Sequence, residues 1–323
     1  MHRRAAGWVL GAAWLVAAAA PAADDGKVVV VTALPVTFSI ATALAAGTRI
    51  EVGNVPEGGR RMSLLPDLFI QRGARYRDTL ARAAAVVTMA KLWPDDPLYT
   101  AARSANIRVV DIDATKPWST TLEGISVALE PREDVPWVSA PPSAAPRSPS
   151  VYFWLSPANV ARAAEIVARD LERLVPEDAA QIEANLAVYR DALLDLKREY
   201  EAKLAELPDL TVAALAPEFV YLTNDFGVYV DGYFLEQDVD WSDEDLSAFE
   251  AYLRDGGIRV VIHKWEPEAP IRAAIDAAGA RLVVLDPIDL GLVEGERLVA
   301  EGFVRSLRAN LESLYSTLAV TNE

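Results

Sequence analysis

The sequence predicts an α/β protein: two βα lobes with mainly parallel sheets, joined by one long α-helix. Three features support this fold class. Short β-branched runs alternate with helical stretches in the first part of the chain, the same alternation returns after Pro208, and one long helical segment lies between the two series. Strands that alternate with helices are typical of parallel sheets, because each helix returns the chain to the same edge of the sheet.

Four apolar runs are expected to be the strands of the first lobe. They are residues 27–31, 49–52, 86–88 and 107–112. Helices are expected over residues 35–45 and over residues 77–87, which lead into the third run. Residues 130–150 contain six prolines among Ser and Ala, and this composition predicts a flexible surface loop.

The segment 156–206 is strongly helical. Ser156 followed by Pro157 is typical of a helix start, with Ser as the N-cap and Pro in the first turn. Pro176 breaks the pattern and is expected to begin a second, longer helix that ends before Pro208. Apolar residues on that helix recur at helical spacing, namely Ile182, Leu186, Tyr189, Leu193, Leu196, Tyr200 and Leu204. A helix of about 28 residues is about 40 Å long, which is enough to connect two lobes.

The alternation of strands and helices resumes after Pro208. Strands are expected over residues 211–215, 258–263 and 281–285, and helices over residues 226–233, 243–254, 270–278 and 296–317. Ser242 precedes an acidic first turn and is expected to be an N-cap, since the acidic residues around it lack the glycine and the spacing of an EF-hand. The expected boundaries are 23–176 for the N-terminal lobe, 177–207 for the linking helix and 208–323 for the C-terminal lobe.

Residues 1–22 have the pattern of a cleavable secretory signal peptide. Two arginines near the start precede an uncharged apolar run from Ala5 to Ala20, and Ala20-Pro21-Ala22 fits an A-x-A cleavage site. The apolar run is shorter than the ~20 residues that a transmembrane helix needs. An uncleaved anchor is the alternative. The expected product is a soluble periplasmic protein that does not span the membrane.

The composition excludes several functional classes. With 31 Lys and Arg against 47 Asp and Glu, the formal net charge is −16, which argues against a nucleic-acid partner. The absence of cysteine excludes disulfides, Cys-based zinc sites and iron–sulfur clusters. A Ser-His-Asp triad would depend on His263, because His2 lies in the expected signal peptide, and no G-x-S-x-G motif occurs. The protein is expected not to be an enzyme, with an exported α/β hydrolase as the alternative.

Five short strings occur in an order that resembles a known family. They are Tyr152-Phe153-Trp154-Leu155-Ser156-Pro157, the helix from Pro176 to Tyr189 with its Ala184-Asn185 pair, Asn224-Asp225-Phe226-Gly227, Glu266-Pro267, and Leu285-Asp286-Pro287. They are similar to the H-x-W-L-D-P, E-x-N-x-x-x-Y, H-D-x-F-G, E-P and L-D-P motifs of the metal-binding solute receptors of bacterial ABC importers, the zinc and manganese group with a rigid linking helix. The resemblance covers nearly the whole chain after the signal peptide. It implies a protein that encloses its ligand between two lobes and presents it to an ABC transporter permease, and a monomer is expected.

The resemblance does not extend to most of the metal ligands. Members of this family usually bind the ion with His side chains together with Glu or Asp. The matching positions here are Arg60, or Arg61 if the register shifts by one residue, Tyr152, Thr223 or Asn224, and Asp286. A guanidinium has no lone pair to donate and repels a cation, and a phenol with an ordinary pKa of about 10 is a poor zinc ligand. A nitrogen-rich tetrahedral zinc site is therefore not expected.

Three interpretations of the cleft remain open. In the first, a divalent ion, Mn²⁺ rather than Zn²⁺, is held mainly by oxygen ligands; the candidate ligands are Asp286, Asp225, Glu266, Asn224 and His263. In the second, Arg60 and Arg61 bind an anionic or chelated solute between apolar walls; the candidate walls are Tyr152, Trp154 and Phe226. In the third, Arg60 pairs with Asp286 and closes the pocket, and the protein is a metal-independent partner of another protein.

Some of these candidates also have plain structural interpretations. His263 ends an apolar strand, and Trp154 fits a core position. Glu266 fits the N-terminus of a helix, where its charge complements the helix dipole.

Overall fold

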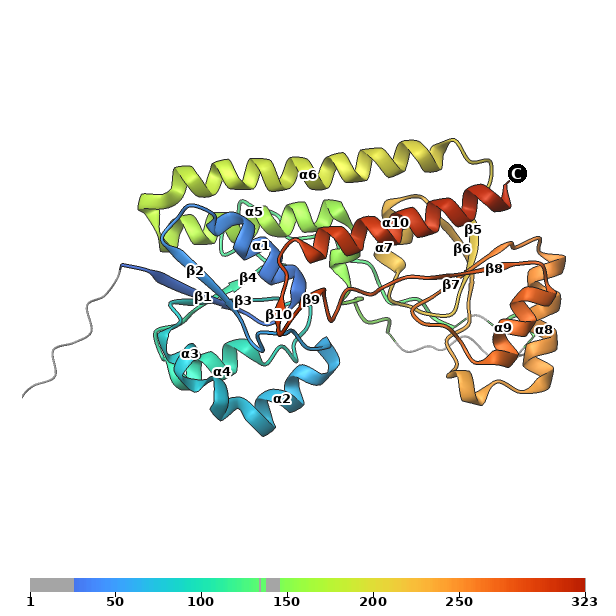
Figure 1. Cartoon of the computed structure of the whole chain (residues 1–323), viewed down its shortest axis with the longest axis horizontal. Helices are drawn as coiled ribbons and strands as arrows, with labels where there is room; N and C mark the ends of the chain where they lie inside the picture. Colours follow the sequence, from blue (N-terminus) through green and yellow to red (C-terminus); the bar gives the residue numbers. More distant parts are fainter. Residues whose placement is uncertain (1–25, 134, 138–145, 323) are drawn as a thin grey trace, which may run out of the picture.

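The computed structural model describes residues 26–133, 135–137 and 146–322. It has two α/β lobes side by side, with long helices running across both along one side of the molecule (Figure 1). The predicted fold class is confirmed. The expected signal peptide, residues 1–22, lies outside the described residues. Within those residues, no helix is both long enough and apolar enough to cross a membrane.

The N-terminal lobe is built around a four-stranded parallel sheet with the strand order β2-β1-β3-β4. Its strands are β1 (Val28–Thr32), β2 (Ile50–Asn54), β3 (Ala85–Thr88) and β4 (Val110–Asp113). Its helices are α1 (Pro35–Ala45), α2 (Leu65–Arg72), α3 (Arg77–Arg82) and α4 (Leu98–Ala105). All four predicted strands are confirmed. The short helices α2 and α4 are not predicted by the sequence pattern, and α3 ends earlier than predicted because Ala83 is already extended.

Two helices connect the lobes, α5 (Pro157–Leu174) and α6 (Ala179–Ala205). Ser156 caps α5 as predicted, since its hydroxyl accepts a hydrogen bond from the backbone N–H of Asn159 at 3.1 Å. The predicted stripe of α6 faces inward, and its buried members are Ile182, Leu186, Leu193, Leu196, Tyr200 and Leu204. In Figure 1, α6 extends over both lobes and α10 runs beside it. The predicted linking helix is therefore a continuous rod that packs on both halves of the protein.

The C-terminal lobe repeats the architecture with a parallel sheet of order β6-β5-β7-β8. Its strands are β5 (Thr211–Ala214), β6 (Tyr229–Tyr233), β7 (Val260–His263) and β8 (Arg281–Val284). Its helices are α7 (Val220–Asp225), α8 (Asp243–Asp255), α9 (Ala269–Ala277) and α10 (Gly302–Thr321). Ser242 caps α8 as predicted, in a capping box with Asp245.

Two expected helices of this lobe are corrected by the structure. Residues 226–233 do not form a helix, because α7 ends at Asp225, Gly227 adopts a left-handed φ of 66°, and the chain then pairs with β5 as β6. Residues 296–301 also lie outside a helix. They belong largely to a hairpin of β9 (Val293–Glu294) and β10 (Arg297–Leu298), and α10 begins at Gly302.

Residues 134 and 138–145 of the expected flexible loop lie outside the described residues, and the described flanks of the loop contact other parts of the protein. Trp137 stacks on Phe234 with the ring centroids 5.3 Å apart, and its indole N–H donates to Asp245 at 3.1 Å. Leu129 and Pro149 form an antiparallel bridge between the two flanks. The segment thus reaches from the first half of the chain to α8 of the C-terminal lobe.

Both lobes share one hydrophobic core. The main buried cluster extends from the N-terminal sheet through α5 and α6 to one face of the C-terminal sheet and to α10. A smaller cluster lies on the other face of that sheet, under α8 and α9. Trp154 is almost fully buried between the lobes, and its indole N–H donates to the carbonyl oxygen of Pro287 at 2.8 Å. The core therefore holds the two lobes in a defined relative position.

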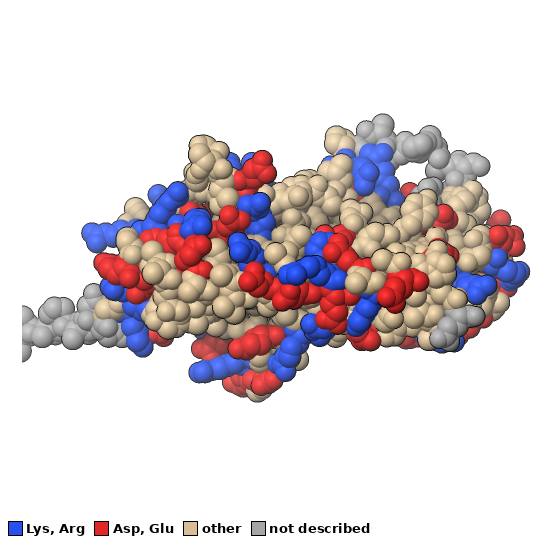
Figure 2. Space-filling model, turned by 90° about the horizontal axis from the view of Figure 1, so that it is seen from above, with Lys and Arg blue, Asp and Glu red and all other residues tan. Residues whose placement is uncertain are grey.

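The surface above the long helices carries charges of both signs. Figure 2 shows acidic and basic side chains intermingled over this face. Several of them form ion pairs, for example Arg169 with Glu183 at 2.7 Å and Lys203 with Glu199 at 3.0 Å. Such a face is typical of a solvated surface, and it offers no continuous basic stripe of the kind that binds nucleic acid.

Candidate functional site

A cavity of about 500 Å³ lies where the two lobes meet. Its walls come from the loop after β2, the segment before α5, the loops that follow β5, β7 and β8, and one side of α10. Four of these six segments, the loops after β2, β5, β7 and β8, follow parallel strands. The carboxyl ends of parallel strands meet at one edge of a sheet. Ligands of open α/β folds bind at such edges, so this cavity is the candidate binding site.

Arg61 is the arginine that the N-terminal lobe contributes to the cavity. Both arginines are exposed, and of the two positions that the sequence left open only Arg61 is among the described residues that line the cavity. The preceding turn is close to the C-terminal lobe: Gly59 has a φ of 70°, and a Cβ there would lie 2.8 Å from the carbonyl oxygen of Leu290. Glycine is therefore required at this position, and it brings Arg61 to the mouth of the cavity.

Tyr152 is the aromatic residue of the sequence prediction that lines the cavity. Its half-buried ring lies 5.2 Å from that of Trp154, measured between centroids. Burial, and then the negative charges of Glu218 and Asp289, raise the pKa of the Tyr152 hydroxyl well above its ordinary value. The phenol is therefore neutral at physiological pH and can serve as a hydrogen-bond donor.

The other two predicted walls have structural roles. Trp154 is 1% exposed, and its indole N–H donates a hydrogen bond to the carbonyl oxygen of Pro287. It therefore positions Asp286, which precedes Pro287 in the chain. Phe226 is buried in the core, and the ammonium group of Lys197 lies 5.2 Å from its ring centroid. Neither ring lines the cavity.

Asp286 lines the cavity as predicted and is held by its surroundings. Its backbone N–H donates to Asn310 Oδ1 at 2.8 Å, and its carbonyl oxygen accepts from Asn310 Nδ2 at 2.6 Å. Its Oδ1 accepts from the backbone N–H of Ile288 at 2.8 Å. Ile288 has a φ of 58°, which is unfavourable for a β-branched residue. Asp286 therefore presents its carboxylate from a fixed and locally strained turn.

The cavity also contains charged residues that the sequence analysis did not single out, namely Glu218, Lys264 and Asp289. Glu218 is buried and forms an ion pair with Lys264. Burial raises the pKa of Asp289; the nearby Arg61 opposes this shift, while Asp286 and Glu218 reinforce it. Their positions in the chain offered a signal: like Asp286, Glu218 and Lys264 lie in loops that follow parallel strands, where the binding edge is expected.

The remaining candidate ligands lie elsewhere. Asp225 accepts a hydrogen bond from the Ser156 hydroxyl at 2.7 Å and pairs with Lys197 at 3.0 Å, so its charge is used to join helices. Glu266 is exposed and pairs with Arg272 at 2.8 Å. Asn224 lines a separate groove beside β6.

His263 is buried at the end of β7, behind the cavity wall. Its Nε2 is 3.8 Å from Asp238 Oδ1, and neither ring nitrogen has a hydrogen-bond partner among the described residues. Burial lowers its pKa, so the ring is neutral at physiological pH. The structure thus does not bring Asp286, Asp225, Glu266 and His263 together, and across the described ranges no group of three or more His, Asp or Glu residues is placed to hold a metal ion.

The salt bridge that the closed-pocket interpretation requires is not found among the described residues. Among the ion pairs of the described residues there is none between Arg60 and Asp286, and none that involves Arg61. The donors that do face the cavity are carboxylate and phenol oxygens. They suit a hard cation better than Zn²⁺, and they share the site with two positive side chains.

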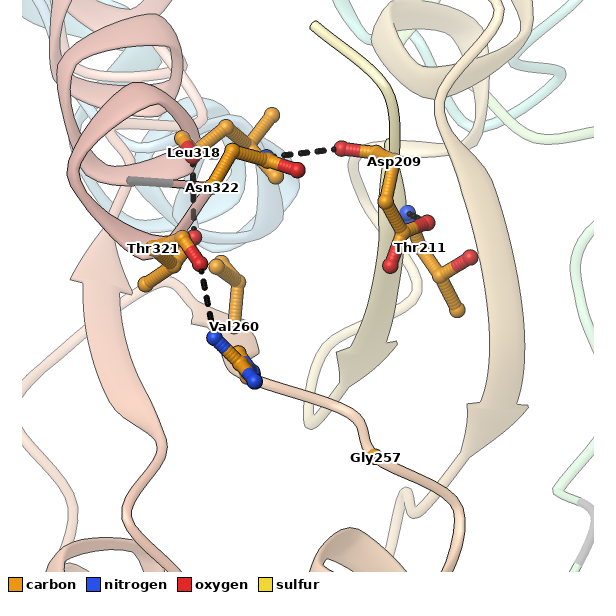
Figure 3. A pocket seen from close by; sticks show the side chains of 8 residues that line it. Asp209, Thr211, Gly257, Val260, Leu318, Thr321 and Asn322 are labelled. Carbon is orange, nitrogen blue, oxygen red and sulfur yellow. Dashed lines mark hydrogen bonds between the residues drawn. The ribbon is translucent and has the colours of Figure 1, made fainter.

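A second pocket, of about 330 Å³, lies at the far end of the C-terminal lobe and is shown in Figure 3. Its polar groups bond to one another: Asn322 donates to the carbonyl oxygen of Asp209 at 3.0 Å, and Arg259 donates to that of Thr321 at 3.1 Å. These bonds satisfy the end of α10. The pocket therefore has a structural explanation and is not the candidate site.

Comparison with curated proteins finds relatives among zinc-binding transport proteins. The zinc-binding protein AdcA of Streptococcus pyogenes serotype M1 is 25% identical over 176 residues, which are 53% of this chain and 34% of that protein. The high-affinity zinc uptake system protein ZnuA of Brucella suis is 27% identical over 169 residues, which are 51% of this chain and 50% of that protein. The matched part is thus half or less of the length of these relatives.

Comparison with solved structures agrees on the fold. A mutant of FpvC from Pseudomonas aeruginosa matches with a TM-score of 0.70 and 18% sequence identity. The match covers 90% of this chain and 99% of the FpvC chain. The complex of FpvC with Mn²⁺ gives a TM-score of 0.67 at 17% identity, and the match covers 91% of this chain and 99% of the FpvC chain.

A family model described as the periplasmic component A of the zinc-uptake complex matches residues 73–317, which is well over half of the sequence, and the chain therefore belongs to this family, as its motifs implied.

Proposed function

We propose that the protein is the solute-binding component of an ABC importer of the metal-ion family. It captures its cargo in the cavity between the lobes and presents it to the permease. Membership of the zinc-uptake family supports this role and makes an exported hydrolase the weaker alternative. The observation that carries the proposal is Asp286, the carboxylate of the Leu-Asp-Pro motif, fixed at the wall of an interlobe cavity.

The cargo is a divalent metal ion held by oxygen donors, Mn²⁺ in preference to Zn²⁺. Asp286 and Asp289 supply carboxylates from one loop, and Tyr152 supplies a phenol from the facing segment. No histidine lines the described wall of the cavity, so the nitrogen ligands that favour zinc are missing there. The structural relative FpvC has been solved with Mn²⁺ and with Ni²⁺, whereas the curated relatives are described as zinc proteins.

The place of action is the periplasm, and the functional unit is a monomer. The pattern of residues 1–22 and the periplasmic family support the location. The shared core of the two lobes supports the monomer, since one chain completes the cavity.

A metal-independent protein that binds an anionic solute is the second candidate. The observation that favours it is Arg61, which lines the cavity and forms no hydrogen bond or ion pair with another described residue. A free guanidinium binds carboxylates and phosphates in a fixed bidentate geometry.

Thermal unfolding of the chelator-stripped protein tests the metal proposal. Mn²⁺, Zn²⁺, Fe²⁺, Cu²⁺ and Ca²⁺ are titrated separately, and a ligand at 100 times its Kd stabilises the native state by about 2.7 kcal/mol. We expect a saturable rise of Tm that is largest with Mn²⁺ and is lost in Asp286→Asn. The exposed Asp191→Asn on α6 is the control and should keep the response. If no ion raises Tm, free or complexed with an organic acid, the metal proposal is wrong.

A further inference from the structure

We infer that the cavity takes its metal ion as a complex with a small organic polycarboxylate of the citrate class, rather than as the bare ion. This inference rests on the proposed function, because it concerns the form in which the same site receives its cargo. Four features of the cavity support it: its shortage of protein ligands, its unpaired guanidinium, its exposed indole and its size.

The protein alone supplies too few ligands for a complete coordination shell. Mn²⁺ prefers about six oxygen ligands. Asp286 and Asp289 line the cavity from the loop after β8, while Glu218 is already paired with Lys264. Within the described part of the chain no cluster of three ligating residues exists. A chelator that brings several oxygens of its own completes the shell without further side chains.

Arg61 provides a reason for the chelator to be anionic. Arg61 lines the cavity together with Asp289 and has no ion pair or hydrogen bond among the described residues. Next to a bare divalent cation this charge is repulsive. Next to a carboxylate of a bound chelator it forms a charge-assisted, bidentate hydrogen bond. The mixed charges of the cavity therefore match a ligand that contains both a cation and carboxylates.

Trp265 provides a surface for an organic molecule. It lines the cavity and is 45% exposed, although tryptophan is usually buried. The ring is held in place by two contacts. It packs edge-on against the His263 ring with the centroids 4.9 Å apart, and its indole N–H donates a hydrogen bond to Asp238 at 3.3 Å. The ammonium group of Lys264 lies 4.5 Å from the ring centroid and covers part of the ring. The carbon skeleton of a chelator can cover the part that stays exposed, whereas a small ion cannot.

The size of the cavity is consistent with the same ligand. A volume of about 500 Å³ lies within the range of pockets that bind small organic molecules, which is roughly 300–1,000 Å³. One water molecule occupies about 30 Å³ of the liquid, so a dehydrated ion would leave most of the space to solvent. A metal–citrate complex fills more of it and touches both lobes.

Isothermal titration of the purified protein tests the inference with three probes: MnCl₂ alone, citrate alone, and the two premixed in equal amounts, with malate and tartrate in place of citrate as further chelators. We expect the premixed complex to bind at least about tenfold more tightly than MnCl₂ alone, and citrate alone to bind weakly. Arg61→Gln should weaken binding of the complex by about tenfold or more, because the charge-assisted bond is lost. The neighbouring Arg60→Gln is the matched control and should bind as the wild type does.

The direction in which Arg61→Gln changes binding affinity distinguishes a bare Mn²⁺ ion from an anionic metal–chelator complex as the cargo. Removal of a positive charge strengthens the binding of a bare cation and weakens the binding of an anionic complex. Trp265→Ala should weaken only the complex, with the similarly exposed Trp118→Ala as its control.

The inference is overturned if MnCl₂ alone binds as tightly as every premixed complex and Arg61→Gln does not weaken the latter; the proposed metal-carrier function then stands. It is also overturned if citrate binds equally well without the metal, a result that favours the anionic-solute function. If none of the metals or their complexes binds, both the inference and the proposed function are wrong.

Discussion

The charged residues of the cavity determine what it can bind, and the sequence revealed only part of them. Tyr152 and Asp286 were predicted because each lies within a recognised motif, whereas for the arginine the sequence left Arg60 and Arg61 open. Glu218, Lys264 and Asp289 belong to no motif that was recognised. Asp225 and Glu266 do not line the cavity, and a string of residues does not show that these carboxylates pair with Lys197 and Arg272.

Buried acids away from the cavity lead to a prediction about pH. Asp96 is buried, and although it accepts backbone hydrogen bonds from Met89 and Leu98, burial raises its pKa to about 6. The folded state thus holds this proton more tightly than the unfolded state. The stability that it contributes is fully present below the ordinary pKa of 3.8 and is lost as the pH rises through about 6.

As the pH rises from below 3.8 to above about 6, the unfolding free energy is expected to fall by at most about 3 kcal/mol because of Asp96. Asp96→Asn should remove this part of the pH dependence, whereas Asp95→Asn, at an exposed neighbouring position, should keep it. Urea unfolding at several pH values between 4 and 8 measures the effect. Identical pH profiles for wild type and Asp96→Asn would show that Asp96 is not responsible.

At the scale of elements, strands and long helices were predicted well and short elements were not. The stripe of α6 repeats over many turns and α5 carries a Ser-Pro start signal, whereas α2 and α4 have only eight residues each, too few for a repeating stripe to stand out. The segment 226–233 was misread because Phe226, Val228 and Val230 fit either structure. The decisive feature is Gly227, which ends α7 and lets the chain enter β6.

Asp225 joins three of these helices, and its replacement should separate stability from binding. It lies at the end of α7 and bonds to Ser156 at the start of α5 and to Lys197 on α6. Asp225→Asn should lower the unfolding free energy by about 1.5–3 kcal/mol, the range for a hydrogen bond to a charged group. Chemical denaturation measures this loss, and titration of the folded variant should give an unchanged affinity for the cargo. A loss of affinity with unchanged stability would mean that Asp225 is a ligand after all.

The turn before Arg61 allows a second test at this scale. Gly59→Ala places a side chain on a left-handed residue and against the carbonyl oxygen of Leu290, so it should cost about 1–2 kcal/mol and weaken cargo binding by displacing Arg61. Gly73→Ala is the matched control, because Gly73 has no positive φ and open space around it. Thermal unfolding and titration of both variants report the two effects. Equal behaviour of the two variants would exclude a special role for the turn.

At the scale of the whole molecule, the shared core limits how far the lobes can move. The main hydrophobic cluster continues from one lobe to the other, α6 packs along both, and Trp154 bonds across the junction to Pro287. We therefore expect small-angle X-ray scattering curves of the free and the cargo-loaded protein to be nearly superimposable. A marked decrease of the radius of gyration on loading would instead indicate wide hinge closure.

The two-lobed architecture follows from the sequence, but the assembly of the cavity does not. The order of strands and helices indicates two parallel sheets, and their carboxyl ends indicate where a ligand binds. Which side chains converge there depends on how the loops after β2, β5, β7 and β8 fold against each other. Gly59 and Ile288, both with left-handed backbones, show that this packing relies on local conformations that no periodic pattern reveals.

Anomalous X-ray diffraction from crystals of the protein loaded with Mn²⁺ and citrate shows directly where the metal binds. We predict one manganese peak in the interlobe cavity, within bonding distance of the Asp286 carboxylate, with electron density for the chelator between the metal and Arg61. A manganese peak at any other place on the chain, with the cavity filled by water alone, would contradict it.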